Sequence, residues 1–252
     1  MIEVRHLSKS FNGRLVLDDI SVTFEKGKTN LIIGQSGSGK TVLLKSLVGL
    51  HTIDSGEIIY GGDVNFSALG VKEKKEIRKQ IGMLFQGGAL FDSQTVEENV
   101  MFPLTMFSEN SYQENLDRVN FCLKRVNLEN VNKLYPAEIS GGMKKRVAIA
   151  RAIALNPQYL FCDEPNSGLD PLTSIVIDNL IKEITQEYDI TTIINTHDMN
   201  SVMEIGDKVV FIYQGKKTWE GSNDDIMNSD NKYLNDFVFA SPLNKKIKRL
   251  LG

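Results

Sequence analysis

One eight-residue segment constrains this chain more than any other, because it matches the phosphate-loop pattern G-x-x-x-x-G-K-[ST] at every position. An apolar run from Thr29 to Ile33 precedes it, and apolar residues at helical spacing follow from Lys40 to Leu50. Glycines in such a loop let backbone amides point inward and bind phosphates at the start of the helix. We therefore expect a nucleotide-binding α/β protein whose loop consists of Gly34, Gln35, Ser36, Gly37, Ser38, Gly39, Lys40 and Thr41.

Two side chains of this loop carry the expected chemistry. Lys40 would reach the β- and γ-phosphates of ATP, and the hydroxyl of Thr41 would bind Mg²⁺. A dinucleotide-binding fingerprint that begins at Gly37 is excluded, since it needs a glycine where Val42 stands. A chance glycine-rich turn is disfavoured, because the flanking strand and helix are those that phosphate binding requires.

Two adjacent acids form the second constellation. Asp163 and Glu164 follow the apolar run Tyr159–Cys162, which is unusual for a buried strand. Open α/β sheets bind ligands at the carboxyl ends of their strands, so we expect the run to deliver both acids to the nucleotide. Neighbouring residues face opposite ways, which predicts Asp163 as a Mg²⁺ ligand and Glu164 as the base that activates water. The alternative is that one acid caps the next segment.

The remaining patterns organise the chain around this core. Strand-like alternation at 2–7 and 15–24 is separated by the turn Asn12-Gly13, which predicts an antiparallel N-terminal part. Residues of about 95–155 are helical in pattern and are punctuated by Pro103 and Pro136. We predict an α/β P-loop NTPase with a RecA-like core, an inserted helical subdomain, one domain over 1–240 and an amphipathic tail over 241–252.

Composition narrows the functional classes. The net charge of −3 argues against wrapping nucleic acid, and the two cysteines, Cys122 and Cys162, suit a reduced compartment. No apolar run reaches the ~18 residues needed to span a bilayer, and the N-terminus lacks the apolar stretch of a signal peptide. We expect a cytoplasmic protein that acts at a membrane only through another subunit.

A third motif identifies a family. Ser140, Gly141 and Gly142 precede a helical run, so that Ser140 is a good N-cap and the glycines leave amides exposed. Taken alone, this segment could be a helix cap that binds nothing. Together with the phosphate loop and the acid pair, the chain resembles the ATPase subunits of ABC transporters over residues 1 to about 222. The resemblance implies that this signature helix closes on the γ-phosphate of ATP held by a second copy, in a head-to-tail dimer beneath an integral membrane permease.

Four further residues match the family by position. Gln86 resembles the Q-loop glutamine near Mg²⁺ and the permease contact, and Asp170 ends a segment similar to the D-loop that links two sites. His197 resembles the switch histidine that contacts the γ-phosphate, and Phe11 resembles the aromatic residue that stacks on adenine. From the residues alone, a core position is favoured for Phe11, and His197 could equally be a cap, whereas His6 and His51 match no motif.

Two departures from the family pattern concern the signature. Its usual form is Leu-Ser-Gly-Gly-Gln, and here Ile139 and Met143 take the first and last places. The exchange of Leu for Ile is mild, but Met143 cannot donate or accept hydrogen bonds as glutamine does. We still expect binding through Ser140 and the backbone amides.

Local variants indicate a subfamily. The segments Gly87–Ser93 and Thr95–Val100, with Ser-Gly-Gly-Met in the signature, resemble the ATPases of Mce-type transporters, which in the Mla system move phospholipids across bacterial envelopes. This resemblance implies an Mce-domain partner and a place on the cytoplasmic face of the inner membrane. Amino-acid importer ATPases are the alternative. A DNA- or ribosome-directed ABC protein and a small-molecule kinase are more distant.

The C-terminal tail leaves three alternatives open. Leu243, Ile247, Leu250 and Leu251 fall at helical spacing between basic residues. They predict a solvated end helix, a contact with the partner ATPase, as the Mla-type resemblance implies, or a contact with anionic lipid.

Overall fold

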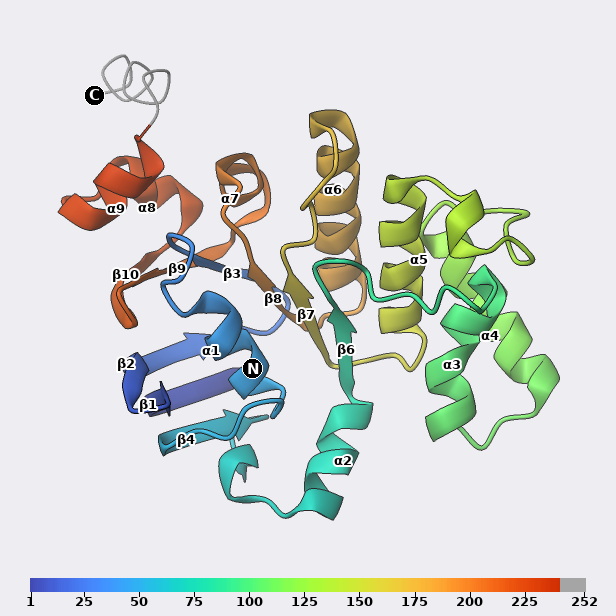
Figure 1. The fold of residues 1–252 in the computed structure, drawn as a ribbon, viewed down its shortest axis with the longest axis horizontal. Helices are drawn as coiled ribbons and strands as arrows, with labels where there is room; N and C mark the ends of the chain where they lie inside the picture. Colours follow the sequence, from blue (N-terminus) through green and yellow to red (C-terminus); the bar gives the residue numbers. More distant parts are fainter. Residues whose placement is uncertain (241–252) are drawn as a thin grey trace.

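A six-stranded sheet runs through the centre of the computed structural model, which describes residues 1–240 (Figure 1). Its strand order is β10-β9-β3-β8-β7-β6, and every pairing except that of β9 with β10 is parallel. The largely parallel sheet predicted from alternating strands and helices is thus confirmed. Its strands are β3 (Thr29–Ile33), β6 (Ile81–Leu84), β7 (Tyr159–Asp163), β8 (Thr191–Asn195), β9 (Lys208–Tyr213) and β10 (Lys216–Gly221).

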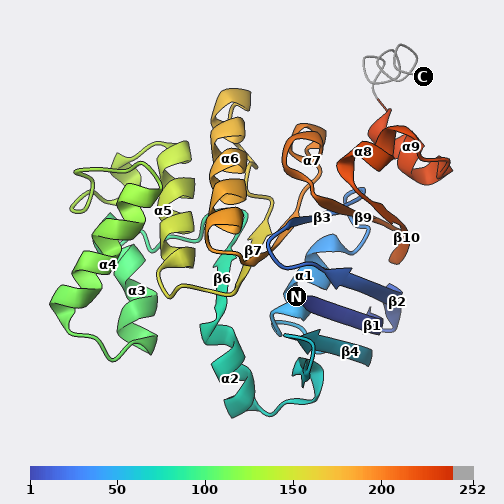
Figure 2. The same cartoon turned by 180° about the vertical axis from the view of Figure 1, so that it is seen from behind.

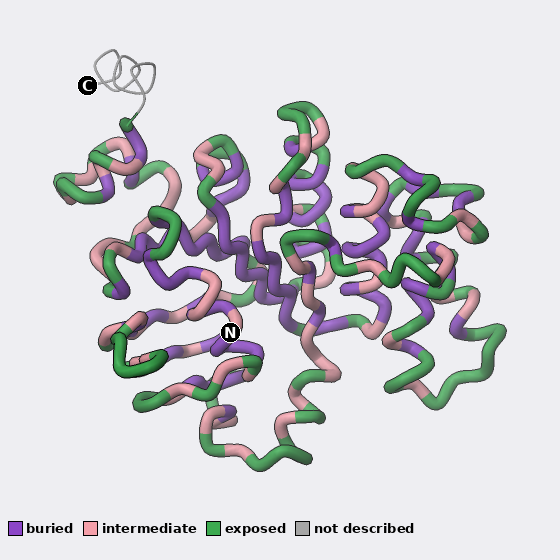
Figure 3. The backbone as a smooth tube through the Cα atoms, in the orientation of Figure 1, coloured by how far each residue is buried: buried purple, intermediate pink, exposed green. Residues whose placement is uncertain are grey.

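The three central strands β3, β7 and β8 are buried along their whole length, as the tube in Figure 3 shows. Successive side chains of these strands enter two different cores: Leu160 packs with the helices on one face, and Phe161 packs with the N-terminal strands on the other. A parallel sheet is normally covered on both faces, which explains why these strands read as continuous apolar runs.

The N-terminal strands form a second sheet of order β2-β1-β4-β5, with antiparallel pairing throughout. Its strands are β1 (Ile2–Phe11), β2 (Arg14–Phe24), β4 (Ser55–Tyr60) and β5 (Val64–Asn65). The turn at Asn12 and Gly13 has φ of 49° and 77°, the left-handed conformation that a two-residue hairpin turn requires. The predicted antiparallel part is therefore confirmed.

The helical lobe lies beside β6 and is seen from both sides in Figures 1 and 2. It contains α3 (Val96–Phe107), α4 (Tyr112–Arg125) and α5 (Gly141–Ile153), within the predicted range of 95–155. Thr95 and Ser111 cap α3 and α4 in reciprocal capping boxes. One detail was wrong: Pro103 does not separate two helices but lies inside α3, where it removes one intrahelical hydrogen bond without ending the helix.

The other helices pack around the two sheets. The sequence did not reveal α8 and α9, because segments of five and seven residues are too short to show a helical period. Tyr233 of α9 stacks on Tyr213 with ring centroids 4.3 Å apart, and Phe237 contacts Phe211 at 5.5 Å. The helices are α1 (Lys40–Leu47), α2 (Val71–Lys79), α6 (Pro171–Glu187), α7 (Met199–Ile205), α8 (Asn223–Met227) and α9 (Lys232–Val238), with 3₁₀ turns at Phe66–Ala68 and Pro136–Glu138.

Two expectations concern membranes and the tail. Over residues 1–240, the structure has no helix with the length and apolar character that a bilayer crossing demands. The amphipathic pattern at 241–252 lies outside the described residues, so its three alternatives stay open.

Asn30 in β3 supports the strand that leads into the phosphate loop. The side chain is fully buried; its Oδ1 accepts from the Glu25 amide at 2.8 Å, and its Nδ2 donates to the carbonyls of Glu25, Lys28 and Thr192 at 3.0 Å each. These bonds fix the turn before β3 against β8.

We predict that Asn30→Ala lowers the free energy of unfolding by about 3 kcal/mol, because it leaves several buried backbone groups unpaired. Urea denaturation measures this change. The exposed Asn110→Ala is the control and is expected within about 0.5 kcal/mol of the parent. Equal stability of the two variants would refute the role of Asn30.

Candidate functional site

Residues 34–39 of the phosphate loop lie between the end of β3 and the start of α1, and Lys40 and Thr41 begin the helix. Gly34, Gly37 and Gly39 have φ of 149°, 78° and 108°, which side-chain-bearing residues rarely adopt. A Cβ on Gly34 would also overlap the carbonyl oxygen of Ile212 in β9. The predicted strand, loop and helix are therefore present, and the loop backbone packs too closely against β9 for another residue at position 34.

Lys40 is held inside this loop. Its Nζ donates to the carbonyl oxygens of Gly34 at 2.8 Å and Gln35 at 3.2 Å, and the residue is only 7% exposed. Burial lowers the pKa of this ammonium group, while Glu164 and Asp163 oppose the shift. Within residues 1–240, Lys40 forms no ion pair, so its positive charge remains available to an anion in the loop.

Asp163 meets two polar side chains at the end of β7. The Thr41 hydroxyl donates to Asp163 Oδ1 at 3.3 Å, and Asn195 Nδ2 donates to Asp163 Oδ1 at 2.5 Å and to Thr41 Oγ1 at 3.0 Å. Asp163 and Asn195 are direct partners in the parallel register of β7 and β8. Sequence reasoning missed Asn195, although it ends an apolar strand as Asp163 does.

The Thr41–Asp163 pair suits Mg²⁺. Mg²⁺ takes one or two protein oxygen ligands and completes its shell with phosphates and water. The residues described contain no cluster of three or more acids, histidines or cysteines that would form an all-protein cage. Asn195 Oδ1 lies buried beside the pair without a hydrogen-bond partner, so it is free to accept from metal-bound water.

Glu164 and His197 form a close side-chain contact at the site. His197 Nδ1 lies 2.6 Å from Glu164 Oε2, with side-chain exposures of 66% and 14%. Glu164 has a φ of 51°, and its amide donates to the Asn195 carbonyl at 2.8 Å. A left-handed φ is costly for a glutamate, and such outliers concentrate at functional sites. Asp163 contacts Thr41 and Asn195, whereas Glu164 contacts His197, so the two acids have different partners, and their separate roles stay a prediction.

A cavity of about 770 Å³ collects most of the predicted residues. Gln86 reaches it from the loop after β6, with its Nε2 donating to Ser167 Oγ at 3.4 Å and its backbone oxygen accepting from Lys145. Phe237 of α9 also lines the cavity, which no sequence pattern indicated. The lining residues are Val16, Gly34, Gln35, Ser36, Gly37, Gly39, Lys40, Thr41, Val42, Gln86, Glu164, His197 and Phe237.

The other predicted residues do not line this cavity. Ser140 caps α5 by accepting from the Met143 amide at 3.2 Å, and Asp170 caps α6 by accepting from the Thr173 amide at 3.0 Å. Phe11 packs edge-on against His51, with centroids 5.2 Å apart. The nucleotide roles of Phe11, Ser140, Gly141, Gly142 and Asp170 therefore remain predictions, which for the signature and D-loop residues require a second copy.

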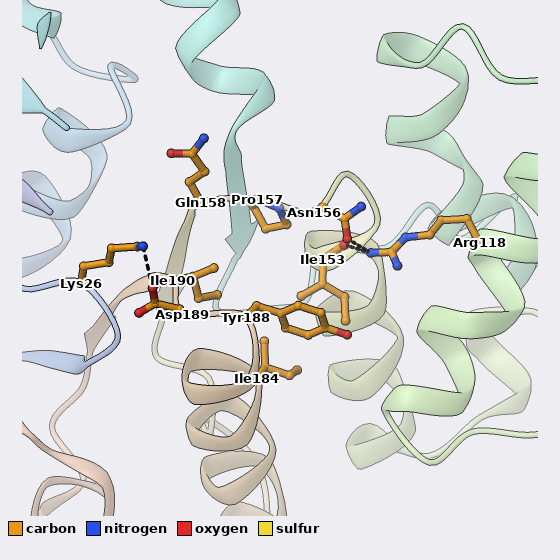
Figure 4. Close-up of a pocket in the computed structure, with 10 residues that line it drawn as sticks. All are labelled: Lys26, Arg118, Ile153, Asn156, Pro157, Gln158, Ile184, Tyr188, Asp189 and Ile190. Carbon is orange, nitrogen blue, oxygen red and sulfur yellow. Dashed lines mark hydrogen bonds and ion pairs between the residues drawn. The ribbon is translucent and has the colours of Figure 1, made fainter.

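A second cavity, of about 390 Å³, lies at the opposite edge of the sheet (Figure 4). It is lined by residues next to the amino ends of β7 and β8, including Gln158 and Ile190, and Lys26 pairs with Asp189 at 2.6 Å beside it. It shares no lining residue with the phosphate-loop cavity, which lies at the carboxyl ends of the strands, where α/β sheets bind their ligands.

The chain is similar in sequence to known ATP-binding proteins of transport systems. The sequence profile described as "ABC transporter" matches residues 17–167. The Probable ribonucleotide transport ATP-binding protein mkl of Mycobacterium tuberculosis is 38% identical over 94% of this chain, and the chain spans 66% of that relative's length. The Intermembrane phospholipid transport system ATP-binding protein MlaF of Haemophilus influenzae is 38% identical, covering 94% of this chain and 90% of the relative.

A further relative in sequence and one solved structure are also similar to this chain. The Methionine import ATP-binding protein MetN of Campylobacter jejuni is 37% identical, covering 96% of this chain and 76% of the relative. A solved dimeric ATP-binding cassette, in a post-hydrolysis state bound to ADP and Pi, superposes with a TM-score of 0.80 at 30% identity, covering 88% of this chain and 99% of that one.

We predict that Asn195→Ala weakens Mg²⁺-dependent binding of a fluorescent ATP analogue by about ten-fold, because Asp163 and Thr41 lose their shared donor. Binding measured in EDTA is expected to stay unchanged. Asn200→Ala, an exposed asparagine nearby, serves as the control. An equal loss in EDTA and in Mg²⁺ would mean that Asn195 supports the loop rather than the metal ligands.

Proposed function

This chain belongs to the ABC transporter family, and we propose that it binds and hydrolyses ATP to drive a transporter, as a head-to-tail dimer beneath a separate membrane permease. The observation that carries this proposal is the convergence of a buried lysine and an ordered carboxylate in one cavity. Lys40 supplies the positive charge for phosphates, and Glu164 faces the same space with His197 at 2.6 Å.

The chain's own residues account for each chemical role. The loop amides and Lys40 bind the phosphates, and Lys40 stabilises the negative charge that develops on the γ-phosphoryl group. Glu164 accepts a proton from the attacking water, and His197 holds that carboxylate in position. Thr41 and Asp163 would hold Mg²⁺, which would supply positive charge to offset that of the phosphates.

A dimer completes the site in this proposal. Ser140 and the amides of Gly141 and Gly142 begin α5, whose N-terminus suits a phosphate. They do not line the chain's own cavity, so they would serve the nucleotide of a second copy. The solved relatives include dimeric cassettes, which supports this arrangement.

We predict that Glu164→Gln keeps ATP binding within about three-fold but lowers hydrolysis by roughly 10²–10⁴, the contribution of a general base. Phosphate release and equilibrium binding measure the two effects. Glu129→Gln changes an exposed glutamate in the same way and is expected to retain full turnover. Turnover of Glu164→Gln at the parent rate would exclude Glu164 as the base.

A cleft beside Gln86 supports the permease as partner. It measures about 370 Å³ and lies between β6 and the helical lobe. Phe91 and Phe102 line it with rings 4.9 Å apart, and both are about two-fifths exposed, at 39% and 40%. Arg151 fixes the loop between Gln86 and Phe91 by donating to the carbonyl of Ala89 at 2.8 Å. An apolar segment seated here would contact the loop that carries Gln86, and so link transport to the nucleotide.

Phospholipid is the transported substrate that we propose, with an Mce-domain protein in the complex. The proposal rests on the Gly87–Ser93 and Thr95–Val100 segments and on the phospholipid-transport relative. A methionine-import relative of similar identity supports a small-solute importer as the second candidate. Purification of the tagged complex from native membranes separates them: an Mce-domain subunit with bound phospholipid supports the first, and a solute-binding protein supports the second.

The same purification tests the cleft. We predict that Phe102→Asp reduces recovery of the permease at least about ten-fold, because a charge in an apolar contact is costly to bury. ATP binding by the variant is expected to match the parent. Val71→Asp replaces a more exposed apolar residue, on α2, and should leave the complex intact. Normal assembly of Phe102→Asp would place the permease elsewhere.

A further inference from the structure

A buried polar cluster is formed by segments that adjoin Glu164 and His197 in the chain. It consists of Asp178 on α6, Asn166 in the loop after β7, and Ser201 on α7. Asp178, Asn166 and Ser201 are 2%, 8% and 1% exposed. None of the three lines the phosphate-loop cavity. A carboxylate buried this deeply is rare unless it is paired, so its presence needs a physical reason.

Some polar atoms of this buried cluster have a hydrogen-bond partner and two of them have none. Asn166 Nδ2 donates to Ser201 Oγ at 3.0 Å, and hydrogen bonding by the Ser201 and Asn166 side chains lowers the pKa of the Asp178 carboxyl, against the effect of burial. Two buried acceptors, Asp178 Oδ1 and Asn166 Oδ1, have no donor. An ionised Asp178 can accept hydrogen bonds from both Asn166 and Ser201. A protonated Asp178 needs an acceptor instead, and the buried Asn166 Oδ1 has no other partner.

Each member of the cluster belongs to a segment that carries a site residue. Asn166 follows Glu164 by two residues, and Ser201 follows His197 by four, inside the first turns of α7. Asp178 projects from α6, a helix of 17 residues that begins directly after Asp170. The cluster therefore connects the loop of Glu164, the helix after His197 and the helix after Asp170.

The surroundings of Asp178 disfavour its ionised form. Burial raises the pKa of this carboxyl from 3.8 to about 6, Ser201 and Asn166 oppose the shift, and Asp198 and Glu204 of α7 add to it. Burial raises the pKa of the Cys162 thiol in β7, and the charge of Asp178 adds to that rise. Lys145 on α5 and Lys182 on α6 bond to the backbone oxygens of Gln86 and Glu204. No cation within residues 1–240 pairs with Asp178.

We propose that Asp178 is a positioning residue for ATP hydrolysis, which joins the Glu164 loop to the His197 helix through Asn166 and Ser201. This inference rests on the proposed function, because it concerns the geometry of the same two site residues. Asp178 touches no reacting atom; it acts by fixing two segments that both end at the cavity.

The cluster holds the Glu164 loop and the His197 helix together most firmly when Asp178 is ionised, because the carboxylate can then accept from Asn166 and Ser201 at once. Protonation replaces one acceptor by a donor aimed at Asn166 Oδ1, which requires the amide to turn and gives up its bond to Ser201. The raised pKa means that the proton stabilises the fold at low pH, and that this stabilisation is lost as the pH rises through about 6. The ionised form thus holds the site at some cost in stability, as active-site groups often do.

The test compares Asp178→Asn with the parent in steady-state ATPase assays of the full chain, or of the purified complex, between about pH 5 and pH 8. Asparagine resembles the protonated acid at every pH. We expect the ratio of parent to variant kcat to be roughly three- to ten-fold at the high end and to fall to about one at the low end, with KM nearly unchanged. A ratio that stays constant with pH would overturn the proposal.

A second variant covers the case in which Asp178→Asn fails to fold. Ser201→Ala removes one donor to the carboxylate, so its kcat ratio to the parent should show the same pH dependence. Thr185→Val is the matched control. Thr185 is buried on α6, the helix that carries Asp178, and its hydroxyl bonds that of Thr192 at 2.6 Å, outside the cluster. The ratio of parent kcat to Thr185→Val kcat is expected not to change with pH. A pH dependence like that of Asp178→Asn would overturn the proposal. A parent that hydrolyses no ATP, alone or in the complex, would instead reject the proposed function.

Discussion

The parallel pairing of β3, β8 and β7 is the constraint on which the rest of this structure depends. It sets the carboxyl ends of three buried strands at one edge, so that the phosphate loop, Asn195 and Asp163 meet although they are far apart in the chain. The register is specific, because a slip of one residue would exchange the two cores that Leu160 and Phe161 enter and would turn Asp163 away from Thr41.

The sequence predicted the parts of this protein that depend on local pattern. The phosphate loop, the acids after a buried strand and the helical lobe each depend on residue type at fixed spacing, and the structure has all three. Asn195 was missed because a single asparagine after an apolar strand carries no pattern, and its role comes only from its register with Asp163. The helices α8 and α9 were missed because they are too short for periodicity, and with them Phe237 in the cavity.

Capping shows where residue type ceases to predict function. Ser140 and Asp170 both begin helices and both satisfy an amide of the first turn; the cap at Ser140 was predicted from its residue type, and the cap at Asp170 was not. A nucleotide contact for either residue depends on a surface of another copy, which no pattern within one chain specifies. The Asp178 cluster is a related case, since its meaning lies in three segments that only the fold brings together.

Lys40 has a consequence for how fast this protein can engage its ligand. The ammonium group is already held by two carbonyls of its own loop, and Gly34 is locked against β9, so the loop is pre-organised when the chain folds. The conformational entropy of that loop is then lost during folding rather than during association. A nucleoside triphosphate would then bind a loop that needs little rearrangement. The slower conformational changes would be movements of the lobes relative to each other.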